Sequence, residues 1–217
     1  MNALNQDLQD INATTVRMLS LVKEQTELAK HALIDADIAA ADKCIDLDHK
    51  VDDYMGTLEQ RILTVIARRQ PTATDLRFLG AIYRGLADIE RAGDYAVHVA
   101  RAGAELAQKP PLKKYNDIRN ILEILAAMIE KTISALADSS VEKAKEAHAM
   151  DKGIDELYEQ IQRELLTYMM EDPATITTAT KLLTVARNLE RLGDHLENVN
   201  EHTIFWLTNQ RYEGYPD

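Results

Sequence analysis

The sequence is poor in cysteine, glycine, proline and aromatic residues, and each shortage excludes a class of protein. Its 217 residues include one cysteine, 8 glycines and 5 prolines, and aromatic side chains make up 5%. The single Cys44 rules out a disulfide framework and suits a reducing compartment such as the cytoplasm. A β-sandwich or barrel needs many turn residues and many β-branched or aromatic strand residues, so we do not expect an all-β fold.

Long apolar runs and an excess of positive charge are also missing. The longest apolar run covers residues 124–129, far short of the roughly 20 residues that a membrane span needs. The polar, acidic residues 1–10 do not resemble a signal peptide. Acidic residues outnumber basic ones by 36 to 25, for a net charge of −11, which disfavours nucleic acid as a partner because phosphate backbones are bound by clustered basic surfaces. We therefore expect a cytoplasmic, all-α protein.

Helix-breaking and capping residues divide the chain into long helices. Prolines at positions 71, 110, 111 and 173 mark turns, Asp172 is a typical N-cap before Pro173, and residues 139–142 match the S-x-x-E capping box that begins with Ser139. Apolar residues recur at heptad-like spacing between these points, and long amphipathic helices with short connections pack as antiparallel bundles. The sequence predicts six helices, over residues 3–34, 37–69, 72–108, 113–137, 140–171 and 173–209.

The two halves of the chain resemble each other. The motif E-R-x-G-D occurs at residues 90–94 and again at 190–194, and an acid-x-x-aliphatic-acid motif occurs at 48–52 and at 151–155. Chance similarity between two alanine- and leucine-rich helical halves is the alternative, but it does not readily account for the doubled E-R-x-G-D. We predict two tandem, duplicated three-helix bundles, in residues 1–109 and 110–209, followed by a frayed tail at 210–217.

Each repeat carries two acid-x-x-x-acid pairs, which are the main candidate functional residues. Residues four apart on a helix share a face, so each pair points two carboxylates the same way. The pairs lie 17 to 23 residues before or after the turn prolines at 71 and 173, and an antiparallel helical hairpin brings equal distances from its turn to equal height. The predicted quartets are Asp48, Asp52, Glu90 and Asp94 in the first repeat and Asp151, Asp155, Glu190 and Asp194 in the second.

Four carboxylates beside an apolar core repel one another unless protons, arginines or cations neutralise them. For any one pair, a solvated helix face is the simpler alternative. Oxygen ligands suit iron, manganese, magnesium, calcium or zinc, and four acids over two helical turns could bridge more than one ion. Arg91 and Arg191 point to the side and can supply only part of the neutralisation. Further candidate ligands one turn on are His98, Asn198 and Glu197, which would make the second site the richer in oxygen.

Motifs of the common catalytic sites are missing. The sequence has no H-E-x-x-H zinc helix, no P-loop, no G-x-G-x-x-G turn and no Glu-x-x-His of the di-iron kind. We therefore do not expect an enzyme, and the alternatives are a carboxylate-bridged di-metal oxidase or hydrolase, or an accessory subunit of another anion or metal transporter. The acidic composition offers no obvious anion pocket.

These motifs resemble the PhoU family of phosphate-uptake regulators. Residues 185–199 read V-A-R-N-L-E-R-L-G-D-H-L-E-N-V, which is similar to that family's second signature, approximately A-R-N-L-E-R-I-G-D-H-A-x-N-I. The resemblance covers residues 3–209. In the first repeat, His98 and Arg101 replace the asparagine and the acid usual in the family.

The resemblance implies two three-helix bundles side by side, each holding a multinuclear metal cluster, often iron or zinc, on the acid-x-x-x-acid pairs. It also implies a non-enzymatic adaptor between the ATPase of a phosphate ABC transporter and a sensor histidine kinase, which represses the phosphate-starvation response when phosphate is plentiful. It further implies a cytoplasmic protein that reaches the inner membrane only through its partners and, as is usual in the family, forms homodimers or larger oligomers.

Overall fold

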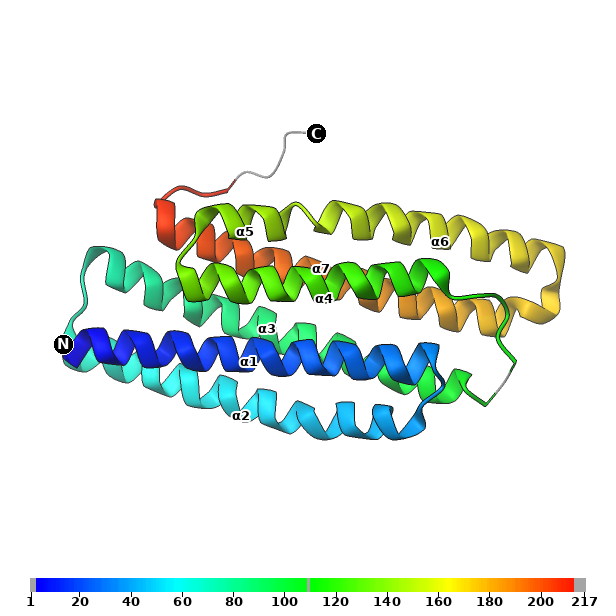
Figure 1. Ribbon diagram of the computed structural model, residues 1–217, viewed down its shortest axis with the longest axis horizontal. Helices are drawn as coiled ribbons and strands as arrows, with labels where there is room; N and C mark the ends of the chain where they lie inside the picture. Colours follow the sequence, from blue (N-terminus) through cyan, green and yellow to red (C-terminus); the bar gives the residue numbers. More distant parts are fainter. Residues whose placement is uncertain (1–2, 109, 213–217) are drawn as a thin grey trace.

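The computed structural model describes residues 3–108 and 110–212, and these are helical apart from short connections (Figure 1). The expected all-α class, built from two three-helix repeats, is confirmed. The first repeat consists of α1 (Ala3–Ile34), α2 (Ile38–Arg69) and α3 (Ala73–Leu106). The second consists of α4 (Asn116–Asp138), α5 (Val141–His148), α6 (Asp151–Glu171), the 3-10 turn η1 (Pro173–Thr175) and α7 (Ile176–Thr208).

Local capping chemistry sets several of these boundaries. The side chain of Asp172 accepts a hydrogen bond from the backbone N–H of Ala174 at 2.9 Å and starts η1, with Pro173 at the first helical position, as expected. The cap of α5 differs from the expectation by one residue. Ser140, and not Ser139, accepts from a backbone N–H in the first turn of α5, because Ser139 adopts a left-handed conformation (φ 50°) that ends α4.

The helix expected over residues 140–171 is interrupted at residues 149–150. Two tight i→i+3 hydrogen bonds, from Met150 N–H to Ala147 O and from Gly153 N–H to Met150 O, each 3.1 Å, replace the α-helical pattern there. The helix is therefore divided into α5 and α6, which follow each other along the same side of the molecule (Figure 1). The interruption places Asp151 at the first position of α6, where its side chain is buried against α7.

The two repeats lie side by side and share one core. The most extensive packing between them is made by α3 and α7, which run antiparallel, and α1 also packs on α4 (Figure 1). Phe78 of α3 contacts Trp206 of α7, with ring centroids 4.7 Å apart. Buried apolar residues from α1 to α7 form one continuous cluster. None of the described helices is long and apolar enough to cross a membrane.

An approximate two-fold axis relates the repeats. Tyr95 of α3 stacks on His195 of α7, with ring centroids 5.7 Å apart and planes inclined by 20°. These two residues hold equivalent places, directly after the two E-R-x-G-D motifs. Equivalent positions that meet on antiparallel helices indicate an axis close to this stack, so each repeat presents the other with the same helix face.

The predicted boundary between residues 109 and 110 stays a prediction. Within the tail expected over 210–217, residues 213–217 lie outside the described residues. The described part of that tail packs on the fold, because the ring of Tyr212 lies 4.6 Å from the ring of His148.

Candidate metal centre

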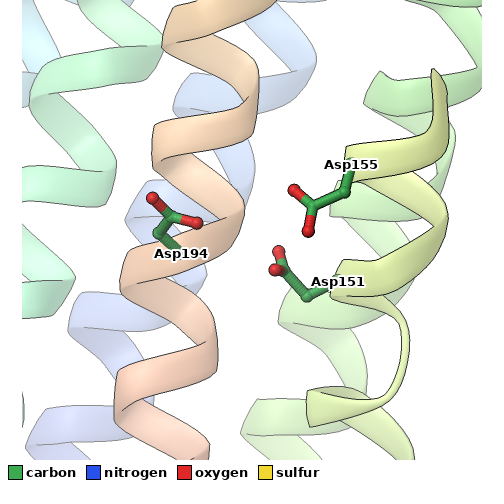
Figure 2. A group of neighbouring side chains, drawn as sticks. All are labelled: Asp151, Asp155 and Asp194. Atoms are coloured by element: carbon green, nitrogen blue, oxygen red, sulfur yellow. The ribbon is translucent and has the colours of Figure 1, made fainter. Parts of the chain in front are cut away.

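Three carboxylates of the second predicted quartet converge between α6 and α7. One oxygen atom from each of Asp151, Asp155 and Asp194 lies within 4.8 Å of the other two. Figure 2 shows the two α6 side chains and the α7 side chain directed into the space between these helices. The prediction that i,i+4 acids on neighbouring helices meet at the same height is met here for these three residues. Glu190, the fourth, is half-buried and one turn before Asp194.

Two buried oxygen atoms in this cluster lack a hydrogen-bond partner. Asp151 is 5% exposed, and neither its Oδ1 atom nor Oε2 of Glu190 has a hydrogen-bond partner among the described residues, although Nε of Arg191 lies 3.6 Å from the Glu190 atom. An unpaired buried carboxylate costs several kcal/mol unless a proton or a cation compensates it. The close approach depends on Gly193, since a Cβ atom at that position would collide with Asp151 Oδ1. The backbone of α7 is therefore shaped to admit the Asp151 carboxylate.

The electrostatics of the cluster oppose full ionisation. Burial, followed by the negative charges of Glu197, Asp155 and Asp194, raises the pKa of Asp151 to about 8. Burial, then Glu201 and Asp194, raises the pKa of Glu197 to about 7. Burial is also the main cause that raises the pKa values of Asp155, Glu190 and Asp194. Glu197 thus belongs to this cluster, as expected, and the cluster favours whatever supplies positive charge.

A buried histidine borders the cluster and was not among the predicted ligands. Nε2 of His148 lies 3.2 Å from Oε1 of Glu197 and 3.5 Å from Oε1 of Glu201, and the side chain is 8% exposed. Its position three residues before Asp151 was the available signal. The interruption of the helix at residues 149–150, which was not foreseen, lies between His148 and Asp151.

The first quartet is more open. Glu90 and Asp94 are half-buried, and burial, then the charges of neighbouring acids of the same quartet, raises their pKa values. Asp52 is exposed. Within the described residues, no three acidic or histidine side chains of this repeat approach as closely as those of the second. The four acids therefore influence one another without forming an equally tight group.

A buried amide distinguishes the first quartet from the second. Nε2 of Gln25, a fully buried residue of α1, donates a hydrogen bond of 3.1 Å to Asp48 Oδ1. A Cβ atom at Gly93 would lie 2.7 Å from Gln25 Oε1, so this glycine admits Gln25 as Gly193 admits Asp151. Sequence reasoning missed Gln25, whose signal was a polar residue within a buried stripe of the first helix.

The two further candidates next to the E-R-x-G-D motifs differ in placement. His98 is exposed, but its charge lowers the pKa of Asp94, so it lies within reach of the first quartet. Asn198 was expected to face the second quartet. The structure instead directs its Nδ2 atom, across the boundary between the repeats, to Oδ1 of Asp88 at 3.2 Å.

Asp88 collects polar partners from the opposite repeat. Nδ1 of His195 lies 2.9 Å from its Oδ1, and Nε2 of His202 lies 3.5 Å from its Oδ2. Although burial opposes it, hydrogen bonding by these histidines and Asn198 holds the pKa of Asp88 well below its usual value. A single carboxylate of α3 thus contacts three polar side chains of α7 and links the two repeats.

Replacing this carboxylate is expected to weaken the contact between the repeats. In Asp88→Ala the donors of His195 and Asn198 lose their acceptor, so the free energy of unfolding should fall by about 2 kcal/mol. Urea denaturation measures the change, and Asp53→Ala, which alters an exposed aspartate of α2, is the control and should stay within ~0.5 kcal/mol of the parent. Equal stability of both variants would show that the network contributes nothing.

Comparison with known proteins relates this architecture to one family. The family model for the PhoU domain matches residues 15–103 and 118–203. A Deinococcus radiodurans protein described as a phosphate-specific transport system accessory protein PhoU homolog is 44% identical over 209 residues, which are 96% of this chain and 98% of that protein. The Pseudomonas aeruginosa homolog of the same description is 34% identical, covering 97% of this chain and 88% of that protein.

Solved structures agree with the fold. The crystal structure of PhoU from Pseudomonas aeruginosa matches with a TM-score of 0.91 at 33% identity, over 95% of this chain and 99% of that chain. The phosphate transport system regulatory protein PhoU from Streptococcus pneumoniae matches with a TM-score of 0.89 at 23% identity, over 97% of this chain and 99% of that chain, and supports the fold alone.

Proposed function

Since this chain belongs to the PhoU family, we propose that it is a metal-binding accessory protein of phosphate uptake. Its relatives are described as accessory proteins of the phosphate-specific transport system. In this role the chain would act without catalysis, as an adaptor between the ATPase of a phosphate ABC transporter and a sensor histidine kinase. It would repress the phosphate-starvation response when phosphate is plentiful.

The buried, unpartnered carboxylate of Asp151 is the observation that carries the metal-binding part. The donor set fits a cation, because the cluster offers oxygen atoms on two helices, holds them close together and raises their pKa values. Asp151, Asp155, Glu190 and Asp194 would hold the ions of the second site. Asp48, Asp52, Glu90 and Asp94 would hold those of the first.

Bound cations would supply positive charge and link the helices at both sites. In the second repeat such a link joins α6 to α7, and in the first it joins α2 to α3. Iron or zinc, in clusters of more than one ion, suits these carboxylate sets, and manganese, magnesium or calcium would use the same oxygen atoms. One helix of each linked pair, α2 or α6, lies on the outer side of its bundle (Figure 1). We propose that partners dock on a surface whose shape depends on the ions, and that the chain acts as a homodimer or larger oligomer.

The double substitution Glu190→Gln with Asp194→Asn tests this proposal. Elemental analysis of untagged protein, purified gently and without chelators, is expected to find more than one iron, zinc or manganese ion per chain. The variant should lose roughly half of them while its circular dichroism stays helical, because removing like charges also relieves repulsion. In host cells growing in plentiful phosphate, the parent chain should keep a phosphate-starvation reporter silent, and the variant should do so less well.

Glu24→Gln with Asp42→Asn is the matched control, because it removes two exposed acids outside both quartets. It should retain the metal content and the repression of the parent. A parent protein without metal, or a variant with unchanged metal content, would contradict the metal-binding part. A silent reporter after deletion of the gene would contradict the regulatory part, whatever the metal content.

A further inference from the structure

A pocket of about 300 Å³ lies where the C-terminal end of α7 meets α3, at the boundary between the repeats. Two arginines reach it from different segments, Arg84 from α3 and Arg211 from the residues that follow α7. The remaining wall combines aromatic and polar side chains of the second repeat. The complete lining is Arg84, Glu201, His202, Phe205, Arg211 and Tyr212.

Both guanidinium groups of this pocket are free. Neither Arg84 nor Arg211 makes a hydrogen bond or an ion pair with any described residue. Two other pockets of similar size also contain basic side chains. They show whether unpaired arginines are common in the pockets of this chain. One, of about 390 Å³, lies between α1 and α2, and the other, of about 400 Å³, lies at the opposite end of the α3–α7 pair.

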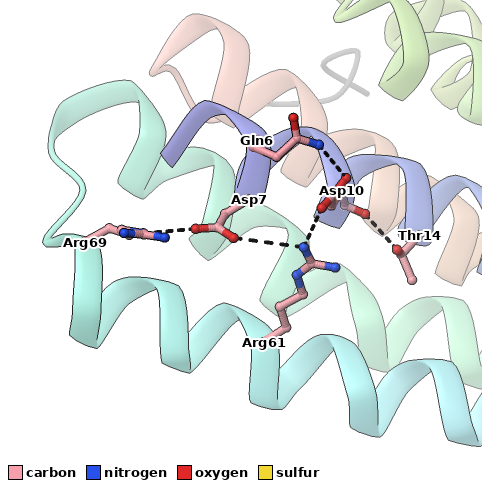
Figure 3. Close-up of polar contacts among 6 residues, drawn as sticks. All are labelled: Gln6, Asp7, Asp10, Thr14, Arg61 and Arg69. Carbon is pink, nitrogen blue, oxygen red and sulfur yellow. Dashed lines mark hydrogen bonds and ion pairs between the residues drawn. The ribbon is translucent and has the colours of Figure 1, made fainter. Parts of the chain in front are cut away.

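Each of those two pockets keeps one arginine without an ion pair, Arg68 in the first and Arg101 in the second, and the other arginine and lysine side chains are paired. Between α1 and α2, Arg61 is 2.7 Å from Asp10 and Arg69 is 3.0 Å from Asp7 (Figure 3). In the pocket at the other end of α3 and α7, Lys181 lies 2.5 Å from Glu105. Of these three pockets in the described part of the chain, only the Arg84–Arg211 pocket brings two unpaired guanidinium groups together.

Glu201, the carboxylate that lines the Arg84–Arg211 pocket, contacts a side chain outside the pocket. Oε1 of Glu201 lies 3.5 Å from Nε2 of His148. His202, in turn, lies 3.5 Å from Oδ2 of Asp88. Within the described wall of this pocket, the two arginines therefore supply the unpaired positive charge, although the chain as a whole carries a net charge of −11.

The duplicated chain shows that this pocket is specific to one end of the fold. The equivalent pocket is related to it by the approximate two-fold axis, at an offset of 100 residues. There Thr184 stands where Arg84 stands here, and Glu105 stands where Phe205 stands here. The two ends therefore differ: one has a lysine paired with Glu105 and a single unpaired arginine, and the other has two unpaired arginines beside aromatic rings.

We propose that this pocket binds a phosphoryl oxyanion between Arg84 and Arg211. Planar guanidinium groups match phosphoryl oxygens by paired, charge-assisted hydrogen bonds. A volume of about 300 Å³ is at the lower end of small-molecule sites, and the rings of Phe205 and Tyr212 can cover an organic group attached to the phosphoryl group. This inference goes beyond the proposed function, and it replaces the sequence-based expectation that no anion pocket is obvious.

Calorimetric titration of the full-length chain tests the proposal with three probes: inorganic phosphate, O-phosphoserine and adenosine monophosphate. At least one should bind saturably, and Arg84→Gln should weaken that binding by about tenfold or more, since it removes a charge-assisted hydrogen-bond donor. Glu201→Gln should strengthen binding, because it removes a like charge from the pocket wall. The probe that binds most tightly identifies the source of the phosphoryl group. Tightest binding of inorganic phosphate indicates a free ion, that of O-phosphoserine a modified protein, and that of adenosine monophosphate a nucleotide.

Two controls separate this pocket from other anion sites. Arg119→Gln removes an exposed, unpaired arginine of α4 and should leave binding unchanged. Arg68→Gln alters the pocket between α1 and α2, and loss of binding there would overturn the assignment. Titrations repeated after chelation should give the same affinity, and binding that disappears with the metal would place the anion on the acidic clusters and also overturn it. Absence of saturable binding by all three probes would refute the proposal and leave the proposed metal-binding role unaffected.

Discussion

Raising the pH from about 6.5 to about 8 is expected to lower the melting temperature of the metal-free protein by ~5 °C. The folded-state pKa of Asp151 is about 8, against an ordinary value of 3.8. Over this interval the unfolded chain has already released this proton while the folded chain still holds it. Stability therefore falls as the pH rises towards the folded-state pKa, by on the order of 2 kcal/mol for an interval of this width.

Two other titratable groups near Asp151 also change the stability of the fold as the pH rises. Glu197, with a pKa of about 7, contributes a loss of the same sign in the lower half of the interval. Burial lowers the pKa of His148, so its contribution has the opposite sign, and it fades as the pH rises above the unfolded-state value of 6.5. Beginning the titration at about pH 6.5 therefore leaves the carboxylates as the main contributors.

Asp151→Asn is the decisive variant, because it keeps the shape of the side chain and removes the titrating proton. Its melting temperature should fall much less over the same range, by the share that Glu197 contributes, and should be higher than that of the parent at about pH 8. Asp48→Asn is the matched control in the first repeat and should keep the slope of the parent, since Asp151 is intact. A parent protein whose stability is flat or rises with pH would refute this account of the cluster.

Gly103→Ala is expected to be among the most damaging single methyl additions in the chain. A Cβ atom there would lie 2.8 Å from three backbone atoms of α1, namely Ala32 C, Leu33 N and Leu33 Cα. Backbone atoms inside a helix cannot move aside as a flexible side chain can, so α1 and α3 would have to separate. Overpacking of this kind should reduce the free energy of unfolding by about 3 kcal/mol, as measured by urea denaturation.

The same substitution at Gly56 provides the control. No atom lies within 4 Å of a Cβ atom built at that exposed position of α2. Alanine there should stabilise the protein by about 0.5–1 kcal/mol, since glycine is the poorer helix former. If both variants were equally stable, the close approach of α1 and α3 would not exist in solution.

The duplication and the acid quartets could be predicted because their signals are local and repeated. The E-R-x-G-D motifs and the turn prolines assign each acid to a helix, to one face of that helix and to a level along the bundle. Asp151, Asp155 and Asp194 meet as this reasoning requires. The interruption at residues 149–150 could not be predicted, because no proline lies there, Gly153 alone does not end a helix, and the two i→i+3 hydrogen bonds become apparent only in the folded chain.

Partners that lie far apart in the sequence account for the remaining differences. Asn198 was assigned to the nearest acid on its own helix, but its acceptor Asp88 is 110 residues away. Gln25 reaches Asp48 from another helix, and nothing in the motif-bearing segments points to it. The free state of Arg84 and Arg211 could not be foreseen either, since the sequence does not show which arginines find an acid and which do not.

The single core shared by both repeats has a thermodynamic consequence. Apolar side chains of all seven α-helices pack in one continuous cluster, so neither half retains its packing when the other opens. The two acidic clusters then belong to one unfolding equilibrium. Linkage requires that whatever stabilises one of them, a proton or an ion, also lowers the population of open forms at the other. Two sites without a common residue can therefore respond as one.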